Sequence, residues 1–335
     1  MEILLTINNL HTHFFLDEGT VHAVNGVNLE IPRGKTVALV GESGCGKSVT
    51  AFSILRLVSS PGKIVSGEIT LHGKNGGIVL TDLEEDGRAI RQIRGKEIAM
   101  IFQEPMTSLS PIHIVGNQIM EAVKLHTQIG RSEAKAHTIH MMKRVGIPNA
   151  DDRFRQYPHE MSGGLRQRAV IAMALSCEPS LLIADEPTTA LDVTIQAQIL
   201  ELMRDLQAEL GMSILLITHD LGVVAEMAEE VAVMYMGRVV EETDVGRIFD
   251  APQHPYTQAL LQSVPGRETQ PGLRLKVIAG SVPDPFQRIK GCPFHPRCEE
   301  AVPGMCDQGE PPQLFELNPG HSVACLVRQM AQSGK

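Results

Sequence analysis

The sequence lacks a long apolar run and an excess of positive charge. Its apolar stretches are all shorter than the roughly 18 residues that a membrane-spanning helix needs, so any spanning part would belong to another chain. Residues 1–7 contain neither a basic segment nor a small-residue cleavage site, which argues against a signal peptide. The formal net charge of -9 disfavours a nucleic-acid-binding protein, because such proteins usually carry a basic face. We therefore expect a cytoplasmic protein.

Cysteine is scarce over most of the chain. Of the six cysteines among 335 residues, only Cys45 and Cys177 precede residue 291. Cys177 ends an apolar segment and is interpreted as a small core residue, and neither of the two is expected to be catalytic. Disulfides are disfavoured in the cytoplasm, so the remaining cysteines are expected to bind a metal rather than to form cystines. These remaining cysteines are Cys292, Cys298, Cys306 and Cys325.

A glycine-rich segment at residues 41–48 predicts a phosphate-binding loop. The apolar run 36–40 precedes it, and the apolar-periodic segment 49–58 follows and stops at a breaker cluster. This strand, turn and helix give the pattern G-x-x-x-x-G-K-[ST] the context that a nucleotide site requires and that a chance glycine-rich loop lacks. Lys47 is expected to reach the β- and γ-phosphates, and Ser48 to bind Mg²⁺. The predicted nucleotide-binding residues of this segment are Gly41, Glu42, Ser43, Gly44, Cys45, Gly46, Lys47, Ser48 and Val49.

Two adjacent acids, Asp185 and Glu186, lie at the end of a second apolar run, which begins at residue 181. Asp185 ends this predicted strand and is expected to hold Mg²⁺ through its water shell. Glu186 comes next and could polarise a water molecule for in-line attack on the γ-phosphate. The alternative is a core strand that ends in two acids by chance, but adjacent carboxylates are costly to hold together without a cation.

Two further segments predict polar groups at a ligand site. Ser162, Gly163 and Gly164 precede the helical run 169–176, so their backbone donors could form a second anion site, or only an N-cap and turn. His219 follows the predicted buried strand 213–218, where an α/β sheet presents residues to its ligand crevice. Alone, such a histidine could equally be an ordinary surface residue.

In their order and spacing, these motifs closely resemble those of the ATP-binding cassette ATPases over residues 1–245. The resemblance assigns Gln103 to the Q-loop, residues 162–164 to the signature, and residues 190–192 to the D-loop. It further assigns residues 41–48 to Walker A, 181–185 to Walker B, Glu186 to the catalytic glutamate and His219 to the switch histidine. The signature departs from the usual Leu-Ser-Gly-Gly-Gln, with Met161 first and Leu165 last, but the residues that contact phosphate are intact.

The resemblance implies an α/β fold, an ABC-type P-loop NTPase core with an antiparallel β subdomain, an α-helical subdomain and a cysteine-containing C-terminal extension. It implies that cassettes pair head to tail, with each ATP between one chain's P-loop and the other's signature. Gln103 would sense Mg²⁺ and water, Asp192 would contact the opposite protomer, and His219 would contact the γ-phosphate. Phe14 matches the aromatic residue that stacks on adenine, with Phe15 or His13 as alternatives.

A narrower resemblance concerns the transported cargo. Residues 102–111, 183–198 and 254–261 look like the oligopeptide/dipeptide branch of bacterial importers, and within it the D-type ATPase subunits of dipeptide permeases. This branch implies an ATPase at the cytoplasmic face of the inner membrane, paired with a second, similar ATPase. Two permeases and an extracytoplasmic substrate-binding protein would complete the system. Relatives in the branch serve nickel, glutathione or oligosaccharides, and a soluble cassette ATPase of iron–sulfur assembly or nucleic-acid work is the more distant alternative.

The expected organisation has a nucleotide-binding core at 1–87 and 168–248, an α-helical subdomain at 88–167 and an extension at 249–335. The extension is rich in proline and glycine, and such a domain often needs a staple. Its cysteines have the spacing C-x5-C-x7-C-x18-C, which is looser than the C-x2-C pairs of zinc ribbons. The resemblance implies a [4Fe–4S] cluster on Cys292, Cys298, Cys306 and Cys325. The alternatives are zinc, with His295 or His321 as a further ligand, and unliganded thiols.

Overall fold

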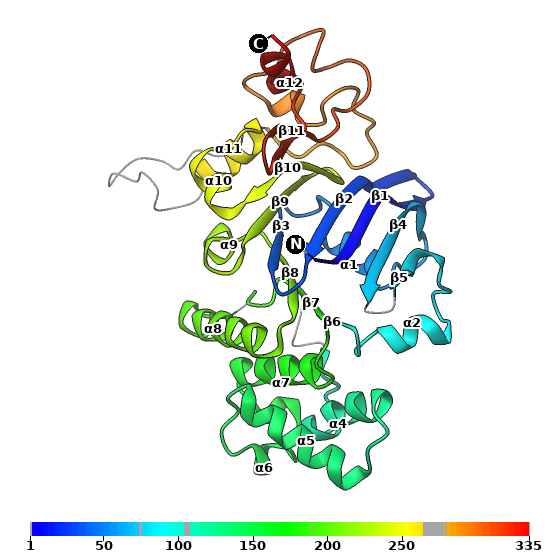
Figure 1. Ribbon diagram of the computed structural model, residues 1–335, viewed down its shortest axis with the longest axis vertical. Coiled ribbons are helices and arrows are strands. Elements are labelled where there is room, and N and C mark those ends of the chain that lie inside the picture. The colour runs from blue at the N-terminus through cyan, green and yellow to red at the C-terminus, as the bar shows by residue number, and fades with distance from the viewer. Residues whose placement is uncertain are drawn as a thin grey trace. The chain divides into compact units, whose positions relative to one another are not determined.

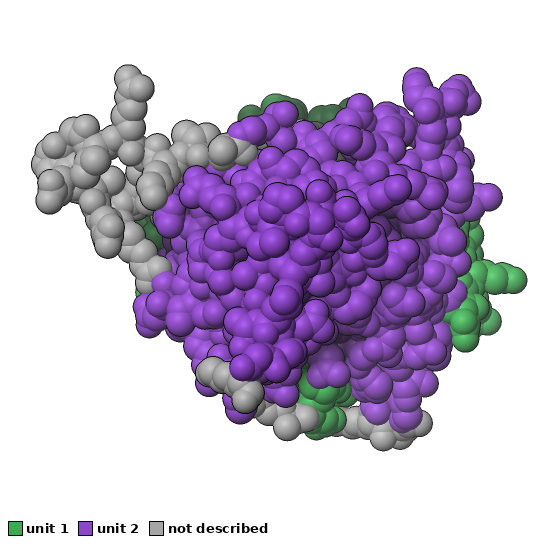
Figure 2. Space-filling model, turned by 90° about the horizontal axis from the view of Figure 1, so that it is seen from above, with its two compact units in different colours: residues 1–4, 31–36, 82–217 green, residues 5–30, 37–81, 218–335 purple. Residues whose placement is uncertain are grey.

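The computed structural model shown in Figure 1 divides into two compact units, which Figure 2 distinguishes by colour. Unit 1 comprises residues 1–4, 31–36 and 82–217, and unit 2 comprises residues 5–30, 37–81 and 218–335. The described residues are 2–73, 76–103, 108–189, 191–263, 278 and 280–334. Residue 190 of the predicted D-loop and residues 104–107 after Gln103 therefore lie outside the described residues.

Parallel strands form the sheet of unit 1. Strand β7 (Leu181–Asp185) pairs in parallel with β6 (Ile98–Ile101) and with β8 (Ser213–Thr218). Every residue of β7 and of β8 is buried, as expected for apolar strands covered on both faces. Because the strands are parallel, their carboxyl ends meet at one edge of the sheet. The residues that follow β6 and β7 are therefore brought to the same edge.

Helices α4, α5 and α7 of unit 1 lie together (Figure 1), and they pack through apolar faces. In α4 (Val115–His126) the buried residues Ile119, Met120 and Val123 recur at helical spacing, and α4 packs against α5 (Arg131–Arg144) and α7 (Gly163–Leu175). The Phe154 ring fills the space where a side chain at Gly116 would lie. The other elements assigned here are α2 (Arg88–Ile93), α6 (Ala150–Arg153), η2 (Pro158–Glu160) and α8 (Val193–Leu210).

Unit 2 contains an antiparallel sheet in the order β2-β1-β4-β5. Strands β1 and β4 pair with Ile7 opposite Ile69, and the register shifts twice between Asn8 and Thr12. Ile7 and Ile69 are both fully buried, so this face of the sheet packs on the core. The elements are β1 (Ile3–Leu16), β2 (Gly19–Pro32), β4 (Gly62–Gly73), β5 (Gly76–Val79) and the short helix η1 (Leu80–Asp82).

A second group of strands in unit 2 has the order β11-β12-β10-β9-β3. Strand β3 pairs in parallel with β9, whereas β9, β10, β12 and β11 pair antiparallel. Strand β3 leads into the P-loop, and helix α1 follows that loop. The elements are β3 (Thr36–Val40), α1 (Lys47–Ile54), α9 (Leu221–Met227), β9 (Glu230–Tyr235), β10 (Arg238–Asp244), α10 (Val245–Asp250), α11 (Pro255–Gln262), η3 (His295–Arg297), β11 (Phe315–Asn318), β12 (His321–Val323) and α12 (Leu326–Ser333).

The C-terminal extension is joined to the core by strand pairing and by a shared apolar cluster. Strand β12 pairs with β10, and the buried His321 Nε2 lies 2.7 Å from Oε1 of Glu241 across that pair. The rings of Tyr235, Tyr256 and Phe294 pack together, with centroids 4.7–5.4 Å apart. The strands of the extension, β11 and β12, are too short to give a periodic pattern in the sequence. They form because β10 supplies an edge to pair with.

Several predicted elements are confirmed, and one boundary is wrong. The structure has strands at 36–40, 181–185 and 213–218, as the sequence predicts. The helix predicted at 49–58 instead begins at Lys47 and ends at Ile54. It stops early because Arg56 adopts a left-handed backbone conformation (φ +55°), which ends the helical hydrogen-bond pattern. The predicted domain ranges remain predictions.

Candidate functional site

The glycines of the P-loop are required by close backbone contacts. Gly41 has φ +154° and Gly46 has φ +106°. A Cβ at Gly41 would collide with the carbonyl oxygen of Met234, and one at Gly46 would collide with that of Ala23. Gly46 is also the N-cap of α1, which begins at the next residue. The loop is therefore closed by neighbouring backbone, and its conformation depends on glycine at both positions.

Lys47 lies over the loop that precedes it. Its side chain is 6% exposed, and Nζ donates hydrogen bonds to the carbonyl oxygens of Gly41 (2.8 Å) and Glu42 (3.1 Å). Nζ also lies 3.7 Å from Sγ of the buried Cys45, whose pKa is raised by burial, so the thiol is protonated at neutral pH. Ser48 is half-buried at the start of α1. The backbone N–H groups and the ammonium group thus gather at one helix start, as phosphate binding requires.

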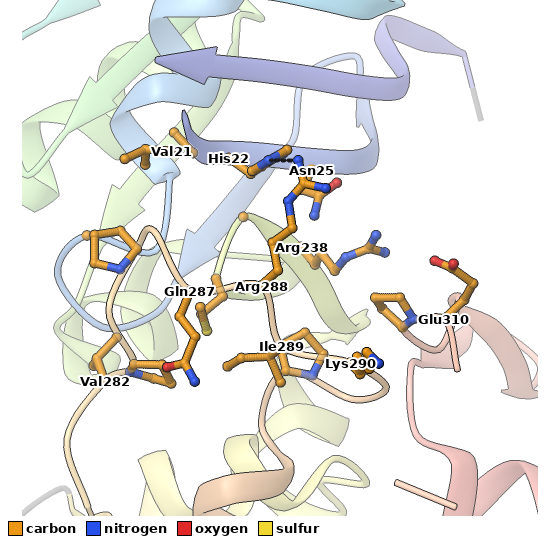
Figure 3. A pocket seen from close by; sticks show the side chains of 18 of the residues that line it. Val21, His22, Asn25, Arg238, Val282, Gln287, Arg288, Ile289, Lys290 and Glu310 are labelled. Atoms are coloured by element: carbon orange, nitrogen blue, oxygen red, sulfur yellow. Dashed lines mark hydrogen bonds between the residues drawn. The ribbon is translucent and has the colours of Figure 1, made fainter. Parts of the chain in front are cut away.

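A pocket of about 670 Å³ adjoins the P-loop within unit 2 (Figure 3). Strand β2, the turn between β9 and β10, and the C-terminal extension all contribute to its walls. The sequence reasoning missed this pocket because its walls come from segments far apart in the chain. The residues that matter for the argument are Ser43, Gly44, His22, Arg238, Arg288 and Lys290.

His22 lies at one side of this pocket and is held by two contacts. Its Nδ1 is 3.0 Å from Nε2 of His13, and its Nε2 is 3.5 Å from Nη2 of Arg288 (Figure 3). Burial, followed by the neighbouring His22, His11 and Arg288, lowers the pKa of His13 to about 4. Burial also lowers the pKa of His22, followed by the effects of Arg288 and His11. Both imidazole rings are therefore neutral at pH 7, and His22 presents an uncharged aromatic ring beside the P-loop.

Phe14, the predicted adenine contact, occupies a different position. It lies in β1 opposite Gly62, where its ring fills the space that a side chain at Gly62 would need. The described residues that line the pocket beside Ser43 and Gly44 include His22 but not Phe14, His13 or Phe15. The contact of Phe14 with a base, or of its alternatives Phe15 and His13, stays a prediction. His22 is a further candidate that no sequence motif singled out.

Glu186 meets Gln103 at the carboxyl ends of β6 and β7, beside Asp185. Asp185 ends β7 and is 1% exposed, and Glu186 follows in a left-handed conformation with φ +48°. Nε2 of Gln103 donates to Oε2 of Glu186 at 3.3 Å, and Oγ1 of Thr189 donates to the same oxygen at 2.9 Å. The structure therefore brings Gln103 and Glu186 together, as parallel strands should. Thr189 is an additional contact that the sequence reasoning did not identify.

The signature and D-loop residues also lie in unit 1, where they start helices. Ser162 is the N-cap of α7, and its Oγ accepts a hydrogen bond from the N–H of Leu165. A Cβ built at Gly163 would meet no other described atom within 4 Å, so the backbone there is open. Gly164 is more enclosed, because a Cβ there would lie 3.1 Å from Ile195 in α8. Asp192 is the N-cap of α8 and accepts from the Ile195 N–H at 3.0 Å.

The predicted site residues are thus divided between the two units. The P-loop and His219 belong to unit 2, and His219 is exposed immediately after β8. Asp220 accepts a hydrogen bond from Gly222 N–H at 2.8 Å and caps α9. Unit 2 also holds Phe14 and the four cysteines of the extension. Unit 1 contributes Gln103, Ser162, Gly163, Gly164, Asp185, Glu186 and Asp192.

The four cysteines of the extension line one small pocket with His254, Phe294 and His295. All are free thiols, and burial raises the pKa of Cys292 to about 12, with a smaller contribution from the other three thiols. His295 contacts this pocket, whereas His321 is bound to Glu241 and does not line it among the described residues. No three His, Cys, Asp or Glu side chains in the described part of the chain are arranged to hold a metal ion. The four thiols therefore share one pocket but are not arranged as a metal centre there, so the expected [4Fe–4S] cluster and the zinc alternative remain predictions.

The helices in the described ranges are all too short or too polar to span a bilayer.

Comparisons with known proteins identify both parts of the chain. Residues 24–189 match the ABC transporter family, and residues 240–306 match the oligopeptide/dipeptide transporter C-terminal region. The chain is 51% identical over 325 residues to the probable peptide ABC transporter ATP-binding protein y4tR of Sinorhizobium fredii, covering 97% of this chain and 95% of the relative. It is 49% identical over 328 residues to the oligopeptide transport ATP-binding protein AppD of Bacillus subtilis, covering 98% and 97%.

A solved structure supports the same fold. The dimeric post-hydrolysis state of the ATP-binding cassette MJ0796, bound to ADP and Pi, is similar with a TM-score of 0.63 and 27% identity. The match covers 72% of this chain and 99% of that chain. The predicted cassette fold and the predicted importer branch are both confirmed. This chain belongs to the ATP-binding proteins of oligopeptide and dipeptide ABC transporters, which are ATPases coupled to transport.

Proposed function

We propose that the chain hydrolyses MgATP and that hydrolysis drives the import of dipeptides or oligopeptides through membrane permeases. The observation that carries the hydrolytic part is the arrangement of Gln103, Glu186 and Thr189 at the carboxyl ends of β6 and β7. Two donors hold one carboxylate oxygen of Glu186, which fixes the direction of the side chain. A carboxylate oriented in this way can accept a proton from an attacking water molecule.

Magnesium fits the residues that the sequence assigns to it. Ser48 offers a hydroxyl oxygen, Asp185 a carboxylate and Gln103 an amide oxygen, which are the hard oxygen ligands that Mg²⁺ prefers. The buried position of Asp185 adds to this fit, because a carboxylate that is 1% exposed gains from a nearby cation. The bound ion would neutralise part of the phosphate charge. Lys47 and the N–H groups of α1 would bind the phosphates, and His219 would contact the γ-phosphate.

The open signature supports a head-to-tail pair of cassettes. The backbone at Gly163 is accessible, so Ser162, Gly163 and Gly164 could donate to the ATP bound by another chain. Asp192 would contact the other chain, near the P-loop of that other chain. We propose that the partner is a second, similar ATPase and that the pair works beneath two permeases at the cytoplasmic face of the inner membrane. A substrate-binding protein outside would deliver the peptide.

The cargo proposal depends on similarity to peptide transporters. Matches to the oligopeptide/dipeptide C-terminal region and to AppD of Bacillus subtilis favour peptides over nickel, glutathione or oligosaccharides. Purification of the chain with its native membrane partners, followed by uptake assays with each class of cargo, tests this part. Uptake of dipeptides or oligopeptides is expected, and exclusive uptake of another cargo would overturn the peptide assignment.

The four-cysteine pocket is a separate part of the proposal. Convergence of Cys292, Cys298, Cys306 and Cys325 on one pocket favours a common ligand, for which we propose a [4Fe–4S] cluster, with zinc as the alternative. Cluster ligands are thiolates, so binding would have to overcome the raised pKa of the Cys292 thiol. Iron, sulfide and zinc should be measured after anaerobic purification. About four irons per chain would support the cluster, one zinc would support the alternative, and neither metal would overturn both.

The hydrolytic assignment is tested by replacing Glu186→Gln in the assembled transporter. We expect ATP turnover to fall by at least about 100-fold, because general-base catalysis contributes about that much, while ATP binding persists. Glu201→Gln, an exposed position in α8, is the matched control and should turn over ATP at the wild-type rate. A wild-type rate in Glu186→Gln would contradict the assignment of this residue.

A further inference from the structure

Glu42 is an acidic residue inside a loop that is expected to bind a polyanion. Its carboxylate is paired with Arg297, from η3 of the C-terminal extension, 255 positions along the chain. Nη1 of Arg297 lies 2.7 Å from Oε2 of Glu42, and Nη2 lies 3.1 Å from Oε1. Two parallel contacts of this kind give a guanidinium–carboxylate pair both strength and a fixed geometry.

The Arg297 side chain is held firmly in its position. It is 4% exposed, whereas the Glu42 side chain is 26% exposed. Its Nη1 also donates to Oη of Tyr235 at 3.4 Å, and its guanidinium carbon lies 5.9 Å and 6.0 Å from the ring centres of Tyr235 and Phe294. A charge buried in this way is screened little by solvent, so its interaction with Glu42 is stronger than that of a surface pair.

The backbone of Glu42 connects this pair to the phosphate-binding residues. Its N–H donates to Oη of the buried Tyr256 at 2.9 Å, and its carbonyl oxygen accepts from Nζ of Lys47 at 3.1 Å. Arg297 and Tyr256 therefore hold Glu42 from the extension side, and Lys47 contacts it from the P-loop side. Glu42 thus contacts both Arg297 and Lys47, so a change at Arg297 would alter the surroundings of Lys47 through Glu42.

Removal of the guanidinium would leave an unpaired, half-buried carboxylate in the P-loop. That carboxylate would repel the phosphates of a nucleotide and would compete with them for Lys47. We propose that Arg297 is a positioning residue of the ATP site. By neutralising and orienting Glu42, it leaves Lys47 and the loop N–H groups to the phosphates, so the C-terminal extension sets the affinity for ATP. The inference rests on the proposed binding of ATP at the P-loop.

A purely structural link would behave differently. If the Glu42–Arg297 pair only fastened the extension to the core, its loss would lower the stability of the fold and would reduce the affinity for all nucleotides equally. An electrostatic role instead predicts a loss of nucleotide affinity. This loss grows with the number of phosphate charges and disappears when Glu42 is replaced by a neutral residue. The two roles are therefore separable by measurement.

The experiment measures dissociation constants of ATP and ADP for the full-length chain, by competition with a fluorescent nucleotide. In Arg297→Gln we expect ATP to bind about tenfold more weakly, because loss of one partner of a buried pair leaves the other charge unpaired. The affinity for ADP should fall less, because ADP carries fewer phosphate charges. The ATP loss should shrink as salt is added. Equal losses for ATP and ADP, or no loss, would overturn the proposal.

Glu42→Gln supplies the decisive second variant. The double variant Glu42→Gln/Arg297→Gln should bind ATP within about twofold of Glu42→Gln alone, because no carboxylate is left to repel phosphate. Failure of Glu42→Gln to rescue the Arg297 variant would overturn the proposal. If Arg297→Gln does not fold, Arg297→Lys replaces it. This variant retains the charge but not the paired contacts, and it should bind ATP better in the Glu42→Gln background than alone.

Arg328→Gln is the matched control. Arg328 makes a similar two-point contact with Glu300 inside the extension, at 2.8 Å and 3.0 Å. Its loss should leave the affinity for ATP unchanged, and an equal loss in this variant would overturn the proposal by assigning the effect to the extension as a whole. A wild-type chain that does not bind ATP would contradict the proposed function itself, whereas ATP binding that is indifferent to Arg297 would contradict only this inference.

Discussion

Two helices of the chain, α1 and α7, begin at glycine-rich segments, and these starts are built differently. At α1, Gly41 and Gly46 are enclosed by the backbone of Met234 and Ala23, and Lys47 is 6% exposed. At α7, a Cβ at Gly163 would meet no described atom within 4 Å. Both starts present backbone donors. Both glycines of the first start are enclosed by their own unit, whereas Gly163 of the second start is open.

We interpret the difference as two kinds of proposed anion site. At the start of α1, the glycine conformations, the Lys47 ammonium group and the neighbouring walls all belong to unit 2, so this start would hold phosphates without another chain. The start of α7 has donors but an open approach at Gly163, which suits a ligand presented by another molecule. Under this proposal, the same sequence feature, glycine before a helix, would serve two purposes, and the surroundings of each helix start distinguish them.

The strongest test of this comparison is the same substitution at both starts. Gly46→Ala should weaken ATP binding by at least about 100-fold, about 2.7 kcal/mol, because the added Cβ collides with Ala23 and the φ of +106° strains it. Gly163→Ala should leave ATP binding by the isolated chain unchanged. Equilibrium binding measures both, with thermal unfolding to confirm that each variant is folded. Equal losses of affinity would contradict the distinction between the two starts.

A second test asks what Gly163 does in the assembled transporter. There, Gly163→Ala should lower ATP turnover about tenfold, because a methyl group would stand between the signature N–H groups and the partner's phosphates. Gly130→Ala is a control, since this glycine also has open space around it but precedes α5 rather than α7. Steady-state ATPase rates decide the matter. Normal turnover in Gly163→Ala would mean that the open start has no role in hydrolysis.

A third test concerns the pocket beside the α1 start. Phe14→Ala and His22→Ala should be compared by their affinities for ATP. Stacking of a base on a ring contributes about 1 kcal/mol or more, so the residue that contacts adenine should lose about fivefold when truncated. The pocket favours His22, whereas the family resemblance favours Phe14. If neither variant loses affinity, the base binds elsewhere.

The smallest effect expected is a pH dependence from the histidines of β1 and β2. Burial, followed by the nearby His22, His11 and Arg288, lowers the pKa of His13 to about 4, below the ordinary value of about 6.5. Between these values the unfolded chain binds a proton that the folded chain does not, so stability falls as the pH is lowered from 6.5 towards 4. His13→Gln should reduce this fall in Tm by about one to two degrees between pH 7.5 and 5. An unchanged pH dependence would contradict the role of His13.

Local sequence was sufficient for the parts of the site that are built from neighbouring residues. The apolar run before Gly41 folds as β3, and the run that ends at Asp185 folds as β7. Both could be predicted because a strand buried on both faces is a continuous apolar run in the sequence. Glycine at positions 41 and 46 follows from the backbone conformations that the loop needs. The Gln103–Glu186 contact could also be expected, because parallel strands align their ends.

Long-range packing settled the remaining features. Nothing near residue 42 in the sequence indicates that Arg297 will neutralise it, and nothing near His22 indicates a pocket shared with Arg288 and Lys290. Likewise, β12 exists because β10 offers it an edge. Such contacts depend on which surfaces meet when the whole chain folds, and residue type and local spacing carry no information about partners hundreds of positions away. The sequence by itself identified the residues expected to bind ATP, whereas only the folded chain shows that Arg297 of the extension pairs with Glu42 of the P-loop.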